Sequence, residues 1–462
     1  MIKLFNNNGS VIDENGILYK VRDILQYGDE VFFDIPSRSL VLLFCQNTVD
    51  SLFFYINCIE RKVVPILIDA QSDYSLTENI IERYNPDFII APTTFSNNFS
   101  NYFCINNFKS YNIFKNNENI VKLLDPILSL LLSTSGTTGS PKLVRLSYSN
   151  LVSNASSICG YLNITDKDRA ISSLPMNYSF GLSIINSHLF VGGSILMTME
   201  SITQRKFWNI FDEFKVTSLS GVPYTFEILK KFRLLNFELP SLKKLTQAGG
   251  KLSNDLIEYF ADYSRNKGID FIVMYGQTEG TARLSYLPSE FINTKLGSIG
   301  RPIPGGRFHL VDEKGVKIEA SETPGELIYT GPNVMLGYAD KLDDLFDGDV
   351  NQGVLSTGDI AYFDFDGFYF IVGRIKRFIK IFGNRINLDE LEQLLKKSGV
   401  DSACVGKDNL LLVYLLLEEN KIIAKDILSK KLGIHPSAIE LRIIQEFPKN
   451  ESGKTLYSQL QF

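Results

Sequence analysis

The chain is organised around Ser133-Thr134-Ser135-Gly136-Thr137-Thr138-Gly139-Ser140-Pro141-Lys142. Apolar runs flank this polar stretch at residues 127–132 and 143–146, and their length and punctuation are typical of buried strands. The stretch is therefore predicted to form a loop between two strands. Its glycines let backbone N–H groups approach an anion, its hydroxyl groups add donors, and Lys142 adds positive charge. This combination predicts a loop that holds the phosphates of a nucleotide.

The spacing within this loop differs from the Walker pattern of kinases and GTPases. Two residues separate Gly136 from Gly139, and Lys142 follows three residues later, whereas the Walker pattern needs four residues between its glycines and a lysine directly after the second. A kinase or GTPase is therefore disfavoured. From this stretch alone, a Ser/Thr/Gly connector without a ligand remains the alternative.

The composition indicates a globular enzyme of several domains. A chain of 462 residues is too long for one ordinary core and predicts about two to four domains. Hydrophobic residues make up 44% of the chain, charged residues 21%, and the net charge is −5. The basic excess of a nucleic-acid-binding protein is missing, so we expect no nucleic-acid partner.

The cysteines and the apolar runs bear on where the protein works. The cysteines are scattered and form no CxxC pair, which favours a reducing compartment and buried thiols over a zinc site. They are Cys45, Cys58, Cys104, Cys159 and Cys404. The N-terminus lacks the apolar segment of a signal peptide, and no apolar run reaches the length of a membrane span. We therefore expect a cytoplasmic protein.

Strand and helix patterns alternate on both sides of the loop, which predicts two parallel sheets covered by helices. Before the loop, strands are predicted at residues 39–45, 63–68 and 88–91, and helices at 49–60 and 76–84. After the loop, a helix is predicted at about 150–161, and strands at 169–174, 194–197, 216–220, 245–248 and 271–275.

The residue composition and the predicted secondary structure change twice more towards the C-terminus. From residue 296 to 372, short extended runs broken by Gly, Pro and Asp predict a small β-rich unit. Beyond Arg374 come charged residues, a helix with leucines on one face, and strands near 403–405 and 410–416. The predicted fold is α/β: an N-terminal domain at residues 1–375, with a β-rich subdomain at about 296–375, and a small α+β domain at 376–462.

Four stretches, in this order along the chain, resemble the core motifs of the adenylate-forming enzymes. They are residues 133–142, Tyr275-Gly276-Gln277-Thr278-Glu279, Ser356-Thr357-Gly358-Asp359 with Gly373-Arg374, and Pro448-Lys449-Asn450-Glu451-Ser452-Gly453-Lys454. This family includes acyl-CoA synthetases, the adenylation domains of peptide synthetases, and luciferases. The resemblance extends over nearly the whole chain, and four motifs in order are far more specific than any one of them.

The resemblance implies which residues bind ATP. Tyr275 is expected against the adenine, Thr278 at the α-phosphate, and Glu279 on Mg²⁺, an ion that prefers few carboxylates together with phosphate oxygens. The backbone at Gly249 and Gly250, another strand end, is expected along the adenine. Further nucleotide-binding positions implied by the resemblance are Ser135, Gly136, Thr137, Thr138, Gly139, Lys142, Gly276 and Gln277.

Asp359 resembles the carboxylate that accepts both ribose hydroxyls in this family, and Arg374 resembles a second ribose or phosphate contact. One carboxylate has enough acceptor capacity for a vicinal diol. An isolated Asp in a Thr-Gly-Asp turn is commonly only a turn former, so this prediction depends on its place in the series of motifs.

The resemblance implies that different C-terminal residues act in the two half-reactions. Lys454 matches the lysine that bridges the carboxylate and the α-phosphate, and Lys376 stands at the family's hinge position. Rotation of the C-terminal domain is then expected to withdraw Lys454 and to present Lys380 and Gly383 to the thiol of CoA or phosphopantetheine. Tyr457 stands where the family has Arg or a similar residue, and the sequence offers no interpretation of it.

The acid substrate is expected to contact the sheet around residues 175–182, where Tyr178 replaces a His that many acyl-CoA synthetases carry. No acidic residue occurs between Ala170 and Met199, which disfavours a substrate with a free α-amino group. His188 and His309 are isolated and are expected to be packed or solvated rather than catalytic.

The resulting hypothesis is an AMP-forming acid–thiol ligase that uses ATP and Mg²⁺. A small carboxylic acid becomes an acyl-adenylate with release of pyrophosphate, and CoA or a separate acyl carrier protein then takes the acyl group. The alternatives are amino-acid adenylation for a separate carrier, transfer of the adenylate to an amine or to oxygen, and a nucleotide-binding subunit without turnover. Retention of Lys142, Glu279, Asp359 and Lys454 together speaks against the last.

Overall fold

The computed structural model describes residues 2–72, 74–95, 99–118, 124–133, 142–233, 238–382, 384–407, 409–432, 434–449 and 455–460. The chain divides into two compact units. Among the described residues, the first unit contains those up to Arg307 together with Thr330–Leu355, and the second contains Phe308–Tyr329 and those from Ser356 onward. The predicted boundary at residue 376 lies inside the second unit and stays a prediction.

The first unit contains an eight-stranded sheet in the order β20-β9-β8-β4-β3-β5-β7-β6. The four central strands β8, β4, β3 and β5 run parallel, as the alternation before the loop predicts, and antiparallel strands extend the sheet on both sides. The bounds are Gly337–Ala339 for β20, Leu143–Ser147 for β9, Leu128–Ser133 for β8, Val64–Asp69 for β4, Leu40–Cys45 for β3, Phe88–Pro92 for β5, Tyr111–Asn116 for β7 and Tyr102–Phe108 for β6. Strands β8 and β9 flank the predicted phosphate loop, whose residues 134–141 lie outside the described residues.

The second sheet of this unit has nine strands in the order β16-β15-β14-β13-β12-β10-β11-β1-β2. Its strands from β14 to β1 are parallel, which confirms the second predicted parallel sheet. The bounds are Arg301–Pro302 for β16, Ser285–Leu287 for β15, Asp270–Tyr275 for β14, Lys244–Gln247 for β13, Ser218–Gly221 for β12, Arg169–Ile171 for β10, Ser194–Leu196 for β11, Ser10–Ile12 for β1 and Leu18–Lys20 for β2.

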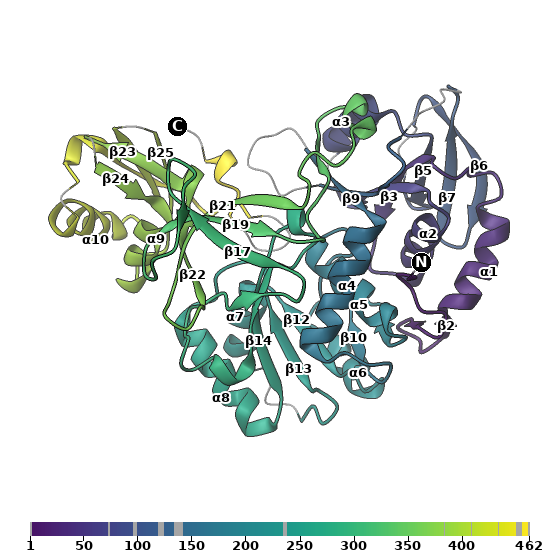
Figure 1. The fold of residues 1–462 in the computed structure, drawn as a ribbon, viewed down its shortest axis with the longest axis horizontal. Helices are drawn as coiled ribbons and strands as arrows, with labels where there is room; N and C mark the ends of the chain where they lie inside the picture. The colour runs from purple at the N-terminus through teal and green to yellow at the C-terminus, as the bar shows by residue number, and fades with distance from the viewer. Residues whose placement is uncertain are drawn as a thin grey trace. The chain divides into compact units, whose positions relative to one another are not determined.

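Two helices fill the space between these sheets. Helix α4 (Tyr148–Leu162) packs on β8 and β9, α5 (Ser179–Phe190) packs on β10 and β11, and the two helices pack against each other (Figure 1). A capping box in which Ser147 and Asn150 bond each other's backbone N–H groups starts α4. The other helices of this unit are α1 (Val21–Val31), α2 (Val49–Glu60), α3 (Tyr74–Tyr84), α6 (Arg205–Glu213), α7 (Pro223–Lys231) and α8 (Asn254–Lys267).

Helix α5 corrects the expectation that a sheet lies around residues 175–182. Its residues are buried on all sides except at its C-terminal end, so its sequence shows no polar face. A short apolar run of this kind cannot be told from a buried strand by periodicity. The consequence is that the residues near Tyr178 belong to the start of a helix.

The second unit begins with the predicted β-rich segment. It forms a five-stranded sheet, β18-β17-β19-β21-β22, with bounds Lys317–Ile318, Arg307–Val311, Gly325–Thr330, Val354–Phe363 and Tyr369–Arg374 in that order. The remaining elements are the hairpin β23 (Phe378–Ile381) and β24 (Asn384–Asn387), the sheet β25 (Ser402–Lys407), β26 (Leu410–Leu415) and β27 (Ile439–Ile443), and the helices α9 (Leu388–Lys397) and α10 (Asn420–Asp426). The leucine face predicted for α9 is buried against β25 and β26 in a core of its own. The predicted α/β class is thereby confirmed.

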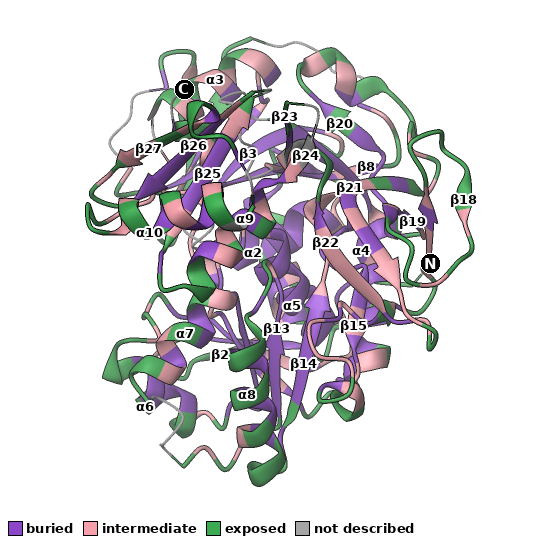
Figure 2. Ribbon diagram, turned by 90° about the vertical axis from the view of Figure 1, so that its left-hand side faces the viewer, coloured by how far each residue is buried: buried purple, intermediate pink, exposed green. Residues whose placement is uncertain are grey.

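The burial pattern follows these layers. Strands such as β13 and β14 are largely buried, whereas α8 has a buried and an exposed face (Figure 2). Four cysteines are buried as predicted, but the prediction is wrong for Cys104, which is exposed because β6 is the edge strand of its sheet. No helix in the described ranges is long and apolar enough to cross a bilayer.

Candidate active site

The strand ends of β13 and β14 bring two predicted motifs together. These strands are parallel neighbours, with Gln247 opposite Val273, so the residues that follow them leave the sheet at the same edge. Gly249 follows β13 with φ of +84°, and a Cβ there would lie 2.7 Å from the hydroxyl oxygen of Tyr178. Only glycine combines this backbone conformation with so close an approach. At the predicted glycine turn, the backbone therefore lies close to Tyr178 with no side chain in between.

The motif after β14 forms a tight turn with a 3₁₀ segment at Thr278–Gly280. A Cβ at Gly276 would collide with the carbonyl of Ala282, so this glycine lets the turn close on itself. The hydroxyl of Thr278 lies 3.1 Å from that of Ser179, the first residue of α5. Two hydroxyl groups from separate elements thus face each other at the position implied for the α-phosphate.

Glu279 is held by a segment that the sequence analysis missed. The hydroxyl of Tyr338, on β20, donates a 2.7 Å hydrogen bond to its carboxylate, and the N–H of Met335 donates to its carbonyl at 2.8 Å. Burial and the Glu279 carboxylate raise the pKa of Tyr338, so the phenol stays protonated and keeps donating. The Asn333 amide also donates to the carbonyls of Gly280 and Arg283, at 2.7 and 2.9 Å.

Lys142 joins the same group of residues from the base of the predicted phosphate loop. Its ammonium lies 3.4 Å from the Asp340 carboxylate and 5.7 Å from the ring centroid of Tyr338. Both ion-pair partners are about half exposed, so the pair contributes little to stability and leaves the lysine available to an anion. Tyr338 therefore contacts both Lys142 and Glu279, and all three residues belong to the first unit.

An ion pair between a buried carboxylate and an exposed arginine lies in the second unit. Asp359 on β21 stands opposite Arg374 on β22, and the Arg374 Nε lies 3.1 Å from Asp359 Oδ1. Asp359 is 3% exposed, and its backbone N–H donates to the Thr357 hydroxyl at 3.1 Å. The structure thus brings the two residues predicted at the ribose together within their own sheet.

Tyr275, Gln277 and Lys380, which are also predicted to belong to the site, lie at the end of β14 and on β23. Tyr275 ends β14, and the Gln277 amide lies 3.4 Å from its hydroxyl. Lys380 lies on β23, and its carbonyl accepts a 2.7 Å hydrogen bond from the N–H of Asn409. Ser135, Gly136, Thr137, Thr138, Gly139, Gly383 and Lys454 lie outside the described residues, and their predicted roles stay predictions.

A magnesium ion at Glu279 would need ligands from elsewhere. The described residues contain no group of three or more His, Cys, Asp and Glu side chains that could hold a metal. One carboxylate beside phosphate oxygens and water is nevertheless the environment in which Mg²⁺ is usually bound by nucleotide enzymes. The donor set at Glu279 fits an ion that arrives with a polyphosphate.

Comparison with known proteins places the chain in a family. The AMP-binding enzyme family matches residues 35–339, and this match ends with strand β20, which carries Tyr338. The chain belongs to this family of AMP-binding enzymes. Its matched region includes the glycine turn, the Thr278–Glu279 turn and the segment that carries Tyr338.

The relatives of this AMP-binding enzyme include ligases and luciferases. Sulfoacetate–CoA ligase of Cupriavidus necator is 29% identical over 343 residues, which cover 71% of this chain and 65% of that enzyme. Luciferin 4-monooxygenase of Nipponoluciola cruciata is 27% identical over 345 residues, covering 71% and 62%. 2-Succinylbenzoate–CoA ligase of Bacillus cytotoxicus is 27% identical over 348 residues, covering 72% and 69%. The matches thus span less than two thirds of the first two relatives.

Solved structures share the fold over nearly the whole chain. The o-succinylbenzoate CoA synthetase of Bacillus subtilis, in complex with its acyl-adenylate intermediate, aligns with a TM-score of 0.77 and 20% identity. That alignment covers 98% of this chain and 95% of the synthetase. The same enzyme with ATP and magnesium aligns with a TM-score of 0.76 and 21% identity over 98% and 96%. The predicted two-sheet fold followed by a small C-terminal part is confirmed by this likeness.

Proposed function

We propose that this AMP-binding enzyme is an acid–thiol ligase. It activates a small carboxylic acid with Mg·ATP to an acyl-adenylate, releases pyrophosphate, and passes the acyl group to the thiol of CoA or of a carrier protein's phosphopantetheine, releasing AMP. ATP and CoA are cytoplasmic substrates, so the cytoplasm is the proposed location. Several of the relatives are CoA ligases, and solved structures of similar fold contain ATP with magnesium or an acyl-adenylate.

One observation carries the proposal: the grouping of Lys142, Tyr338, Glu279 and Thr278 at the carboxyl edge of β14. A cation, an oriented carboxylate and a facing pair of hydroxyls suit a polyphosphate and its metal ion. Mg²⁺ would neutralise charge on the phosphates and orient them for displacement. A binding-only subunit needs no such combination, and none of the relatives reported above supports one.

Each residue has a proposed part in the first half-reaction. Glu279, held by Tyr338, would position the metal ion, and Thr278 with Ser179 would donate to the α-phosphate. Lys142 would bind the outer phosphates as they become pyrophosphate. The protein contributes orientation and charge stabilisation, as in other phosphoryl and nucleotidyl transfers.

The second unit is proposed to complete the reaction. Asp359 would accept the ribose hydroxyls and Arg374 would add a contact to ribose or phosphate. Lys454 would stabilise charge at the α-phosphorus, and Lys376 would act as the hinge of a mobile domain at residues 376–462. Lys380 and Gly383 would then approach the pantetheine thiol.

Release of pyrophosphate from a panel of carboxylic acids, with and without CoA, tests this function. Acid-dependent release that is followed by CoA-dependent formation of AMP and thioester is the expected result. Turnover with an amine in place of a thiol would instead favour transfer of the adenylate to nitrogen, and absence of acid-dependent release with every acid would overturn the proposal.

A further inference from the structure

A small cavity lies in the first unit between α5 and strands β12 and β13. Its lining includes Ser183, Ser187, His188, Lys244 and Arg283. Its volume of about 10 Å³ is close to what one water molecule needs. None of these residues belongs to the nucleotide site proposed above, yet the cavity contains two buried cations.

Arg283 is the exceptional residue of this cavity. It is 2% exposed, and in the described part of the chain its Nε and Nη1 have no hydrogen-bond partner. These two nitrogens carry three of the five N–H donors of a guanidinium. Burial lowers the pKa of Arg283, while Tyr161, which is a hydrogen-bond partner of the guanidinium, and Tyr178 oppose that change.

The surroundings of Arg283 are aromatic rather than acidic. Its guanidinium carbon lies 3.9 Å from the ring centroid of Phe180, which offers a cation–π contact but no full negative charge. Burying a charged group without a paired charge is expensive, and buried charges are ordinarily paired or bound to a ligand. The chain as described supplies an incomplete environment for this cation.

The other polar groups of the cavity already have partners. Lys244 lies 3.0 Å from Asp168, and that carboxylate also accepts hydrogen bonds from Thr165 and Thr217. His188 bonds the carbonyl of Ile184 and the hydroxyl of Ser218, and its burial lowers its pKa to about 4, so it is neutral. The uncompensated charge therefore belongs to Arg283.

Arg145 shows how the same chain satisfies a buried arginine with a structural role. Arg145 is fully buried, and its guanidinium donates to the backbone carbonyls of Tyr338, Leu336 and Asp347. Arg283 has no such set of carbonyls around its Nε and Nη1 among the described residues. The contrast shows that the described residues give Arg283 no set of acceptors like the one around Arg145.

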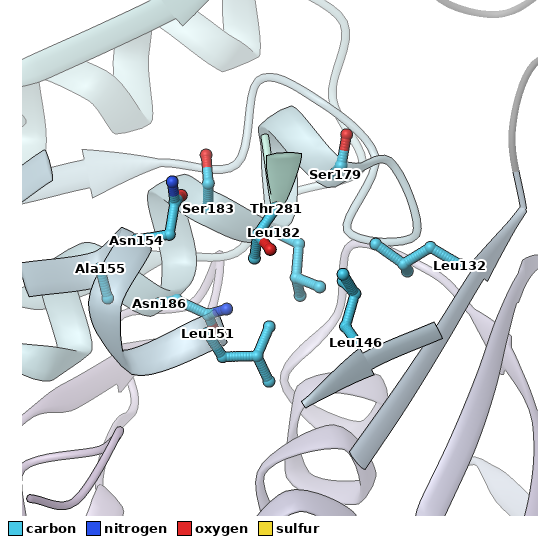
Figure 3. A pocket seen from close by; sticks show the side chains of 10 residues that line it. All are labelled: Leu132, Leu146, Leu151, Asn154, Ala155, Ser179, Leu182, Ser183, Asn186 and Thr281. Atoms are coloured by element: carbon cyan, nitrogen blue, oxygen red, sulfur yellow. The ribbon is translucent and has the colours of Figure 1, made fainter. Parts of the chain in front are cut away.

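Helix α5 connects this cavity to the proposed reaction site. Ser179 faces Thr278 at 3.1 Å, and Ser183 and Ser187 follow it on the same face of the helix. With a rise of 1.5 Å per residue, these positions lie on the order of 6 and 12 Å from Ser179 along the helix axis. A neighbouring cavity, lined by Ser179, Leu182, Ser183, Thr281 and others, borders the first stretch of this path (Figure 3).

We propose that Arg283 binds a second carboxylate at the far end of the acid substrate, so that the preferred substrates are dicarboxylic acids. The inference rests on the proposed function and narrows its substrate class. The helical spacing sets the separation of the two carboxylates at roughly 6–12 Å. A carboxylate is favoured over a larger sulfonate or phosphate because the cavity is small, and lining side chains must shift to admit it.

The test compares straight-chain dicarboxylic acids, from adipic to sebacic acid, whose extended chains match this separation, with monocarboxylic acids of equal length. In the wild-type protein, kcat/KM for pyrophosphate release should favour one dicarboxylic acid over its matched monocarboxylic acid by about 100-fold, since a buried cation discriminates strongly against a substrate that leaves it unpaired. In Arg283→Met this ratio should fall to about 1 or below, and in Arg283→Lys it should be intermediate. A wild-type preference for monocarboxylic acids, or an unchanged ratio in Arg283→Met, overturns the proposal.

A binding experiment separates this inference from the proposed function. The preferred dicarboxylic acid should raise the melting temperature of the wild-type protein without ATP, and should not raise that of Arg283→Met. This shift is expected even if no acid supports pyrophosphate release, an outcome that would refute the ligase and leave the subsite standing. No shift with any acid in the series, together with active ligase, would refute the subsite alone.

Protein stability provides the control against a structural role. Without ligand, Arg283→Met should melt at or above the wild-type temperature because an uncompensated buried charge is removed. Arg145→Met should melt well below it because three carbonyls lose their donor. A large fall in the melting temperature of Arg283→Met would identify Arg283 as a structural residue and overturn the proposal.

Discussion

The guanidinium of Arg377 lies 3.8 Å from the ring centroid of Tyr457. Glu392 completes the cluster, because its carboxylate accepts hydrogen bonds from Arg377 at 2.7 Å and from the Tyr457 hydroxyl at 2.7 Å. Burial raises the pKa of Glu392, although Arg377 and Tyr457 oppose the increase. The cluster links the residue beside the proposed hinge to the residue three positions after Lys454.

Tyr457 is therefore predicted to position the segment that carries Lys454. Lys449 pairs with Thr455, and the N–H of Leu456 donates to the carbonyl of Pro448 at 2.7 Å, so the chain on both sides of residues 450–454 is joined. Tyr457→Ala should lower kcat for adenylate formation about 10- to 100-fold with little change in KM for ATP, because the lysine would no longer be preorganised. Initial rates of acid-dependent pyrophosphate release measure both parameters.

Two observations distinguish this positioning role from a general loss of stability. Tyr457→Phe keeps the ring under Arg377 and should recover part of the activity, whereas thioester formation from supplied acyl-adenylate should be nearly normal in both variants. Tyr414→Phe is the matched control, since it removes a hydroxyl that bonds Arg442 in the same unit. Equal losses in both half-reactions would show that Tyr457 only stabilises the fold.

The strands and turns of this fold that leave a local pattern can be predicted from the sequence, and elements without such a pattern cannot. Apolar runs bounded by Gly and Pro locate the strands β3, β4, β5, β8 and β9, because a strand buried on both faces leaves a local pattern. The glycine turn after β13 is also local, since positive φ at Gly249 requires glycine. Helix α5 leaves no such pattern, because it is buried on nearly all sides.

Residues that act through distant partners could not be found in this way. Tyr338 meets Glu279 across 59 positions of sequence, and Tyr457 meets Glu392 across 65. The presence of a tyrosine at one position does not indicate which distant residue it contacts. The cue available for Tyr338 was its place in the run Gly331-Pro332-Asn333-Val334-Met335-Leu336-Gly337-Tyr338, whose glycines and proline resemble the punctuation of the motifs that were recognised.

Tyr338 is predicted to support metal binding through Glu279. Tyr338→Phe keeps the ring beside Lys142 but removes the 2.7 Å hydrogen bond to the carboxylate. Partners that orient a metal-binding carboxylate typically affect affinity about 10-fold or more, so the Mg²⁺ concentration for half-maximal pyrophosphate release should rise by about that factor. Tyr259→Phe, on the surface of α8, should leave this concentration unchanged. An unaltered magnesium dependence in Tyr338→Phe would remove the residue from the site.

His188 predicts how the stability of the protein depends on pH. Burial lowers its pKa from 6.5 to about 4, so the unfolded chain takes up a proton between these values while the folded protein does not. Stability is therefore lost as the pH falls from about 6.5 towards 4, by roughly 3 kcal/mol from this residue. Chemical denaturation at a series of pH values measures the slope, which His188→Gln should reduce.

The exposed His435 provides the comparison for that slope. The His435 ring bonds its neighbour Ser437 and lies edge-on to Phe382, and the residue is exposed. His435→Gln is the matched control, because it replaces a histidine at the surface and leaves the buried His188 in place. A slope between pH 6.5 and 4 that is the same in His188→Gln and in the wild type would contradict the assignment.

Lys454 is predicted to act in adenylate formation and not in nucleotide binding. A preorganised charge at the developing transition state contributes on the order of 3–4 kcal/mol, so Lys454→Ala should lower acid-dependent pyrophosphate exchange by hundreds-fold. ATP should bind with nearly the wild-type dissociation constant, because Tyr275, Thr278 and Lys142, which are proposed to contact the base and the phosphates, belong to the first unit. Lys449→Ala removes a lysine from the other side of the same joined segment and serves as the matched control, with near-normal exchange expected. Normal exchange in Lys454→Ala would refute the assignment, and a parallel loss of ATP binding would move the residue from the chemical step to the binding step.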